Sequence, residues 1–401
     1  MLFRDNRPLK IMRVLHLLAH HPKKLGSIER WSLRLVQIGR ERGHEVLFGF
    51  SQPPASAKYV AALEKMRVRS LVDCPRSRVD IGFLRRLVTF IKLERIDIVH
   101  THFSPSCHFG NLAAWLARVP GRFWHLRSMS GIDNGAPSSL GHIAAQRVSC
   151  RLVSRIFSVS NAIREDFVRL GLPREKITVL PCGVNLERFC ASDAGGARAR
   201  IRSSLQLSEN TLLVGTVSRA EPIKGLSVLV EAAARVAAVH SNIRWLVVGG
   251  GSQMPQLQSL ARTVGVDNQV IFEGIREDIP DLLQAMDIFV LPSLSEGLPT
   301  AAMEAMASGR PVVCSRVGGL VELVAHGESG LFVPPGDSVA LAEGVLQLVA
   351  DRDLRERLST GAIAQAAKYD DRVLCNRLLD VYEETVPVPL VCGHDEIRSH
   401  D

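Results

Sequence analysis

Residues 296–313, EGLPTAAMEAMASGRPVV, are the stretch that decides the fold of this chain. They begin in a polar loop after a short apolar run at residues 288–291 and continue into a run of small residues. Pro299 stands at the start of that run and Gly309 just past its end, as is typical of a helix. The order of strand, loop and helix predicts an open α/β sheet, which binds ligands at the carboxyl ends of its strands.

Two carboxylates flank the predicted ligand site. Glu296 lies in the loop, and Glu304 lies about one turn into the helix. A carboxylate can accept hydrogen bonds from two neighbouring hydroxyls of a sugar or a ribose. The alternative is that Glu296 is an ordinary loop residue and that Glu304 belongs to a solvated helix face.

Apolar runs alternate with amphipathic stretches along the rest of the chain. We expect strands at residues 11–17, 45–50, 96–100, 122–125, 156–159 and 177–180, and then at 212–217, 244–248, 270–272, 288–291 and 311–314. Helices are expected between them, for example at residues 28–42, 81–95 and 161–170, and a last one at 373–384. Such alternation predicts a doubly wound parallel sheet in each half. The small, polar run at residues 191–199 is predicted to be a linker or surface loop between them.

Composition restricts the class of protein. The 401 residues are 46% hydrophobic, enough for two sizeable cores, and no run of apolar residues is long enough to span a membrane. The N-terminal residues lack a secretory pattern. The eight cysteines are scattered without a CxxC pair, so neither a zinc site nor a disulfide framework is expected. We therefore expect a cytoplasmic protein in a reducing compartment.

Charge is distributed unevenly between the two halves. Residues 1–200 carry 33 Lys and Arg against 15 Asp and Glu, whereas residues 201–401 carry 16 against 26. The basic half could face phosphates, an anionic membrane or a charged acceptor. Its helix at residues 81–95 has apolar residues on one side and basic residues elsewhere, which fits a membrane-surface helix or an ordinary amphipathic core helix. Nucleic acid is disfavoured, because no nucleic-acid-binding motif is visible.

The stretch GTVSRAEPIKG, residues 215–225, combines two cations with a predicted helix start near Leu226. A helix N-terminus offers free N–H groups and the positive end of its dipole. Arg219 can bind a pyrophosphate with two hydrogen bonds, and Lys224 adds a point charge. The alternative is two surface cations in a loop.

Other loops of the second half give weaker signals. Three glycines, with Gly250 in the middle, follow a strand and would let backbone approach a ligand closely, although a tight turn explains them as well. They are no dinucleotide fingerprint, because Met254 stands where the last glycine would be needed. The loop at Arg276 could border a nucleotide base through backbone groups. The sequence DRD at residues 351–353 is interpreted as solvated surface, and no metal cluster is visible.

In this order, Arg219, Lys224, the glycine turn, Glu296 and Glu304 resemble the donor-binding domain of family 4 glycosyltransferases. The resemblance covers roughly residues 10–385, including the inter-domain segment at residues 158–189 and the late loop SGLFVPPGD at 329–337. It implies the GT-B fold, in which two Rossmann-like, doubly wound domains face each other across a cleft. The implied divisions are an acceptor-binding domain at residues 1–188, a donor-binding domain at 189–370, and a C-terminal helix and tail at 371–401, with the helix packing back towards the first domain.

The resemblance also implies roles in the second half. Arg219 and Lys224 would bind the diphosphate of a nucleotide-sugar, and Glu304 would bind the ribose hydroxyls. Glu296, together with backbone around Gly297 and Leu298, would hold the hydroxyls of the donor sugar.

In the first half, the turn KLGSIER at residues 24–30 resembles the N-terminal glycine loop of the family, so Gly26 would lie near the diphosphate and the acceptor. Arg127 stands where many members have a histidine that contacts the donor sugar, and His125 precedes it by two residues. His102 is a candidate to line the acceptor cleft; the alternative is a packed or surface histidine.

The implied reaction is transfer of a hexosyl group from a UDP- or GDP-sugar to a glycan or lipid-linked glycan precursor, with retention at the anomeric carbon and without a metal or cofactor. The leaving phosphate would take the proton of the acceptor hydroxyl. The basic first half suggests peripheral contact with the cytoplasmic face of an anionic membrane. Two alternatives remain: a sugar-nucleotide epimerase of the same fold, and a non-catalytic partner protein that keeps the fold.

Overall fold

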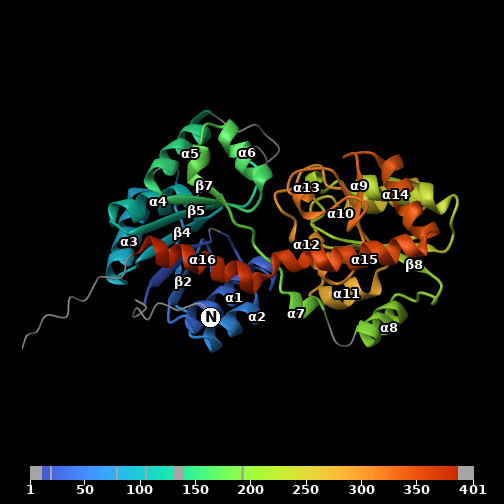
Figure 1. Cartoon of the computed structure of the whole chain (residues 1–401), viewed down its shortest axis with the longest axis horizontal. Helices are drawn as coiled ribbons and strands as arrows, with labels where there is room; N and C mark the ends of the chain where they lie inside the picture. Colours follow the sequence, from blue (N-terminus) through green and yellow to red (C-terminus); the bar gives the residue numbers. More distant parts are fainter. Residues whose placement is uncertain are drawn as a thin grey trace, which may run out of the picture.

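The computed structural model describes residues 11–18, 20–77, 80–103, 106–130, 140–190 and 194–386. They form two lobes, each built on one parallel sheet with helices packed on it (Figure 1). In β1, the neighbouring residues Val14 and Leu15 belong to two different hydrophobic cores, one on each face of the sheet. Both faces are buried because the helices that connect parallel strands cover them.

The first lobe holds a seven-stranded sheet in the order β3-β2-β1-β4-β5-β6-β7. Its strands are β1 (Arg13–Leu17), β2 (Glu45–Phe50), β3 (Ser70–Val72), β4 (Ile98–His102), β5 (Gly121–Leu126), β6 (Arg155–Ser158) and β7 (Ile177–Val179). Its helices are α1 (Ser27–Glu41), α2 (Ala57–Lys65), α3 (Ile81–Leu93), α4 (Ser106–Leu116), α5 (Leu140–Leu152) and α6 (Asn161–Arg169), with a short 3-10 turn η1 (Arg174–Lys176).

The second lobe holds a six-stranded sheet in the order β10-β9-β8-β11-β12-β13. Its strands are β8 (Leu212–Val217), β9 (Ile243–Val248), β10 (Val270–Gly274), β11 (Ile288–Leu291), β12 (Val312–Ser315) and β13 (Gly330–Val333). Its helices are α9 (Leu226–Ala237), α10 (Met254–Thr263), α11 (Ile279–Ala285), α12 (Thr300–Ala307), α13 (Leu320–Leu323), α14 (Ser338–Ala350) and α15 (Arg352–Ala366), with 3-10 turns η2 (Pro222–Lys224) and η3 (Ala367–Tyr369).

Two segments cross between the lobes. The first runs from β7 through α7 (Leu186–Phe189) to α8 (Ala194–Ser204), and the second runs from η3 into α16 (Asp371–Thr385). They meet where Val184 and Asp370 form a parallel bridge. Beyond this bridge α16 returns to the first lobe and packs against α1, so that the last described helix belongs to the core under the first sheet (Figure 1).

The structure corrects several expectations drawn from the sequence. The expected linker at residues 191–199 is helical from Ala194, because α8 buries Ala197 and Ile201 while Arg198 bonds Asp287 at 2.6 Å. β4 runs to His102 rather than ending at residue 100. The short strands β3 and β13 were not expected at all.

No helix in the described ranges is both long enough and apolar enough to cross a membrane. The DRD sequence is surface, as expected: Asp351 caps the N-terminus of α15 by accepting a hydrogen bond from the Leu354 N–H at 2.8 Å, and Asp353 is exposed.

Candidate functional site

The second sheet reverses its strand order between β8 and β11, which lie side by side although they are far apart in the chain. Open α/β sheets bind ligands at this kind of switch point. Lys224 follows β8 and Glu296 follows β11, and their Nζ and Oε1 atoms lie 2.6 Å apart. Ser293 Oγ donates to the same Oε1 at 2.7 Å. The structure therefore joins two predicted site residues in one ion pair, in which the Glu296 side chain keeps 7% exposure.

Glycine lets the two loops pack that closely. Gly225, before α9, has a φ of +60°, and a Cβ there would lie 2.2 Å from the Pro292 carbonyl oxygen. This position requires glycine on both grounds. Arg219 lies in the same loop as Lys224 and is exposed, and this loop leads into the start of α9.

The glycine turn at residues 249–251 follows β9, which lies on the other side of β8 from β11. A Cβ on Gly249 would lie 1.8 Å from the Ser218 carbonyl oxygen, and one on Gly251 would lie 2.4 Å from that of Ala220. Gly250 sits against Ile275 in the loop after β10. The turn thus packs directly on the Arg219 loop and makes the ends of β8, β9 and β10 one continuous surface.

Arg276 does not offer a free guanidinium to this surface. Its Nε and Nη2 donate to the two carboxylate oxygens of Asp278 at 2.9 and 2.6 Å, and Nη1 bonds Glu273. Its predicted contact with a nucleotide base is therefore left to the backbone of the loop.

Gly297 and Leu298 lie where the two lobes touch. Ser160 Oγ of the first lobe donates to the Gly297 carbonyl at 2.8 Å, and a Cβ on Gly297 would lie 2.9 Å from the Arg127 carbonyl oxygen. Leu298 is partly buried against cores of both lobes. The loop predicted to hold the donor sugar is therefore fixed against the residue predicted to contact that sugar from the other side.

Glu304 occupies the most unusual electrostatic environment of the site. Burial raises the pKa of its carboxyl group to about 7, even though Arg188, Arg30 and Lys24 favour the charged form. These three cations belong to the first lobe and to the segment that leaves it. Arg30 and Lys24 flank Gly26, whose N–H donates to Glu29 Oε2 at 2.9 Å at the start of α1. The glycine loop of the first lobe therefore lies on the side of Glu304.

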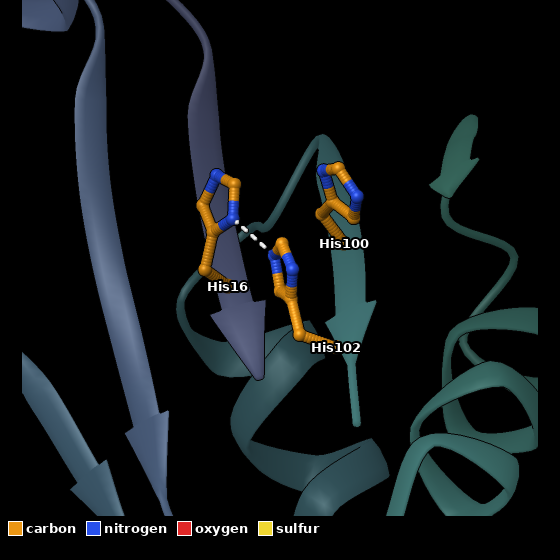
Figure 2. Close-up of side chains that lie close together, drawn as sticks. All are labelled: His16, His100 and His102. Atoms are coloured by element: carbon orange, nitrogen blue, oxygen red, sulfur yellow. Dashed lines mark hydrogen bonds between the residues drawn. The ribbon is translucent and has the colours of Figure 1, made fainter. Parts of the chain in front are cut away.

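The first sheet has its own switch point between β1 and β4. His16 of β1 pairs in register with His100 of β4, and His102 follows on the same face. Figure 2 shows the three imidazoles together, with His16 Nδ1 and His102 Nε2 2.9 Å apart. His102 has no exposed surface, which fits the alternative of a packed histidine better than a residue that lines an acceptor cleft. As the last residue of β4 it points into the core instead.

Arg127, which follows β5, contacts His102. Its Nε donates to His102 Nδ1 at 3.1 Å, and its guanidinium carbon lies 4.4 Å from the centroid of the Trp31 ring. A cation over an aromatic face is stabilised by the ring quadrupole. Arg127 is therefore held on two sides while it remains partly exposed.

The three histidines also form a grouping that the sequence did not reveal. One ring nitrogen from each of His16, His100 and His102 lies within 4.8 Å of the others, close enough to consider a metal ion. Two of these rings hydrogen-bond each other, and the third bonds the Tyr382 hydroxyl. The positive charge of Arg127 on His102 further disfavours a cation. The arrangement fits a hydrogen-bond network better than a metal site.

The carboxylate of Glu322 links the two lobes, and we call this contact the clasp. Glu322 of α13 accepts hydrogen bonds from the Asn161 N–H and side-chain amide through Oε2, and from the Ala162 N–H through Oε1, all at 2.8 Å. The two backbone donors are free N–H groups of the first turn of α6, where a negative charge is favourable. The second lobe thereby caps a helix of the first.

Sequence reasoning missed several of these residues. Gly318 and Gly319 pack on the backbone of Glu296 and Gly297, and this glycine pair after an expected strand was a readable signal. Glu322 and Arg188 gave no signal, because their partners lie in the other lobe.

Two protein-family profiles match the chain, one in each lobe. The profile of "Glycosyltransferase Family 4" matches residues 28–188, and that of "Glycosyl transferases group 1" matches residues 197–365. The chain belongs to the group 1 and family 4 glycosyltransferases. It is 30% identical over 321 residues to a D-inositol 3-phosphate glycosyltransferase of Streptomyces bingchenggensis, covering 76% of this chain and 69% of that protein.

A second relative has a lipid-linked substrate in its name. The N,N'-diacetylbacillosaminyl-diphospho-undecaprenol alpha-1,3-N-acetylgalactosaminyltransferase of Campylobacter jejuni is 28% identical over 307 residues, covering 75% of this chain and 80% of that protein. Among solved structures, Anabaena Alr3699/HepE in complex with UDP-glucose has a TM-score of 0.79 at 24% identity, covering 93% of this chain and 100% of that one. This likeness shows the fold, and the predicted GT-B architecture is confirmed.

Proposed function

We propose that this glycosyltransferase moves a hexosyl group from a UDP- or GDP-sugar to a hydroxyl of a glycan or lipid-linked glycan precursor. In the proposed reaction the anomeric configuration is retained, and neither a metal ion nor a cofactor takes part. The observation that carries the proposal is the Lys224–Glu296 pair at the β8/β11 switch point, with Arg219 in the same loop and Glu304 one helix turn into α12. The UDP-glucose in the Anabaena structure and the diphospho-undecaprenol compound in the name of the Campylobacter relative are consistent with it.

The diphosphate binds at the start of α9 in this proposal. When the bond from the anomeric carbon to the phosphate oxygen breaks, negative charge builds on the leaving nucleoside diphosphate. Lys224, Arg219 and the positive end of the twelve-residue helix α9 are aimed at the place where this charge develops. Fixed groups of this kind stabilise the transition state without reorganising.

Glu296 has two tasks here. Its Oε1 anchors Lys224 and accepts from Ser293, which leaves Oε2 to accept from a donor-sugar hydroxyl. A carboxylate engaged in this way is poorly placed to attack the anomeric carbon. We therefore assign the acceptor proton to an oxygen of the leaving phosphate, while the acceptor oxygen forms the new bond on the face from which the phosphate departs.

The acceptor approaches from the first lobe. A hollow lies beside Arg127 in this lobe; its lining residues are Phe103, Trp124, His125, Leu126, Arg127, Ser128, Met129, Ser130, His142, Gln146 and Phe167. Aromatic rings together with hydroxyl, amide and imidazole groups suit a sugar, which has apolar faces and polar edges. Trp31 of α1, whose ring lies against the Arg127 guanidinium, borders the same approach.

Nucleotide binding tests the proposal first. We expect one of UDP, GDP or ADP to raise the melting temperature clearly above the other two. At a hundredfold excess over Kd the stabilisation is about 2.7 kcal/mol, which corresponds to a shift of several degrees. Product analysis with the matching sugar nucleotide, with and without acceptor glycans, then separates transfer from epimerisation. A new sugar nucleotide formed without acceptor would contradict transfer, and no shift with any nucleotide would favour a non-catalytic role.

Peripheral binding to a membrane is a second part of the proposal. The apolar side of α3 is buried through Phe83, Leu87 and Ile91. This side therefore packs in the core, as expected for an ordinary amphipathic core helix. Arg85 and Lys92 remain exposed, and so does Leu93. We propose that this outer face contacts anionic headgroups from the cytoplasmic side.

Vesicle binding tests this part. Arg85→Glu with Lys92→Glu should abolish co-sedimentation with phosphatidylglycerol vesicles at low salt. The charge-matched control Arg352→Glu with Arg357→Glu, on the exposed surface of α15, should bind as wild type does. Equal binding by both double variants would contradict a contact through α3.

A further inference from the structure

We propose that Tyr382, on the C-terminal helix α16, is a positioning residue for Arg127 that acts through a chain of buried imidazoles. The chain runs from Arg127 through His102 and His16 to Tyr382 and ends at His100. This inference rests on the proposed function in one respect, which is that Arg127 contacts the donor sugar or the leaving group.

The direction of every hydrogen bond in the chain follows from its first member. A guanidinium N–H is always a donor, so His102 Nδ1 must accept from Arg127 Nε. A neutral His102 then carries its proton on Nε2 and donates to His16 Nδ1 at 2.9 Å. His16 in turn carries its proton on Nε2, which faces the Tyr382 hydroxyl oxygen at 3.4 Å. Tyr382 is left to donate its own proton to His100 Nδ1.

Burial supports the neutral state that this scheme needs. His16, His100, His102 and Tyr382 have no exposed surface. Burial, together with Arg127, lowers the pKa of His16 to about 3 and holds the pKa values of His100 and His102 well below the usual range. Burial also raises the pKa of the Tyr382 hydroxyl, so it remains a donor. A neutral imidazole has one donor and one acceptor, and a fixed partner at one nitrogen sets the role of the other.

Packing leaves the rings little freedom to reorient. The His100 and His102 rings stack with centroids 4.3 Å apart, and the His16 ring meets the edge of Trp31 at 5.7 Å. The same Trp31 ring lies under the Arg127 guanidinium. A change at Tyr382 therefore alters the orientation of Arg127 through groups that are packed as well as hydrogen-bonded. In this proposal α16 contributes to catalysis and does not only stabilise the first lobe.

Tyr382→Phe removes one hydroxyl and tests the chain. We expect kcat to fall about tenfold, because Arg127 loses its fixed orientation, while the Kd for the nucleotide stays within about twofold because the diphosphate is held by the other lobe. The matched control is Tyr59→Phe, which removes another buried hydroxyl of the same core, one that bonds Ser32 Oγ at 2.7 Å. This control should keep wild-type kcat. A tenfold loss of kcat in Tyr59→Phe would show that removing any buried hydroxyl of this core has the same effect, and would overturn the proposal.

A double-mutant cycle separates this proposal from the proposed function. If Tyr382 acts through Arg127, Tyr382→Phe should change kcat less than about twofold in an Arg127→Lys background. Additive losses would overturn the positioning role while leaving the reaction itself intact. Wild-type turnover by Arg127→Lys alone would instead contradict the role given to Arg127 in the proposed function.

Nitrogen-15 NMR of the histidine-labelled wild-type chain tests the proton positions without any variant. At pH 7 we expect His16, His100 and His102 all to carry their proton on Nε2. A proton on Nδ1 of His102 or His16, or the shifts of a metal complex with stoichiometric zinc in the purified protein, would overturn the chain.

Discussion

The switch points of the two sheets have the same topology but opposite electrostatics. At β8/β11 the second lobe places an ion pair, Lys224 with Glu296, beside an exposed arginine and a helix start. At β1/β4 the first lobe places neutral, fully buried histidines behind the single cation of Arg127. In the proposed function, one edge receives a charged group and the other orients a single side chain.

Net charge alone would assign an anion site to the first lobe. The first half of the sequence is strongly basic and the second half is acidic, yet the predicted diphosphate site lies in the second. In the proposed function, local arrangement therefore outweighs the overall balance, because a few cations at strand ends and a helix dipole attract the anion. Substitutions at each edge can break this contrast between a charged edge and a neutral one.

The largest effect is expected from Lys224→Ala. Loss of this cation removes charge from the place where the leaving diphosphate becomes negative, and removing one such group typically costs about a hundredfold in kcat. Steady-state kinetics with the preferred sugar nucleotide measures it. Arg262→Ala, an exposed second-lobe residue on α10, is the matched control and should be silent. If kcat of Lys224→Ala stayed within threefold of wild type, roughly 0.7 kcal/mol, the charged edge would not stabilise the leaving group as proposed.

A smaller effect is expected where the two edges are held together. Glu322→Ala removes the cap that the second lobe provides for α6, and capping interactions are worth about 1 kcal/mol. We expect kcat/KM to fall about fivefold to tenfold, because closure of the lobes becomes less favourable. Glu328→Ala on the nearby exposed turn is the control. Unchanged kcat/KM in Glu322→Ala would show that the clasp does not contribute to closure.

The smallest effect is a pH dependence at Glu304. Because the pKa of this carboxyl group is raised to about 7, it is largely protonated below that pH and becomes a carboxylate above it. In the proposed function this carboxylate accepts hydrogen bonds from ribose hydroxyls, so affinity for the intact sugar nucleotide should rise about threefold between pH 6 and 8. Calorimetric titration measures it, and the intact sugar nucleotide avoids the titrating terminal phosphate of a free diphosphate. Glu304→Gln should flatten the profile; an equally steep profile in that variant would assign the titration to another group.

The second lobe could be predicted largely from sequence because its signals are local. Pro299 and Gly309 bracket one helix, and Lys224 and Glu296 each follow an apolar run that is unmistakably a strand. The expectation that strand ends gather at one edge then brings the residues together without knowledge of any long-range contact.

The chain of imidazoles could not be predicted in this way. His16 and His102 stand 86 residues apart, and Tyr382 lies 366 residues after His16, so nothing local marks them as neighbours. A single histidine in an apolar strand has many ordinary explanations. The prediction for residues 191–199 was wrong because a local signal was misleading. The small and polar composition suggested a linker, whereas distant partners, Asp287 among them, stabilise a helix from Ala194.

A crystal structure of the protein with its preferred nucleoside diphosphate tests the central claim most directly. The account predicts the diphosphate at the start of α9, with phosphate oxygens about 3 Å from Lys224 Nζ and the Arg219 guanidinium, and ribose hydroxyls at the same distance from Glu304. A nucleotide bound at the β1/β4 edge of the first lobe, or one that leaves Lys224 bonded to Glu296 alone, would contradict it.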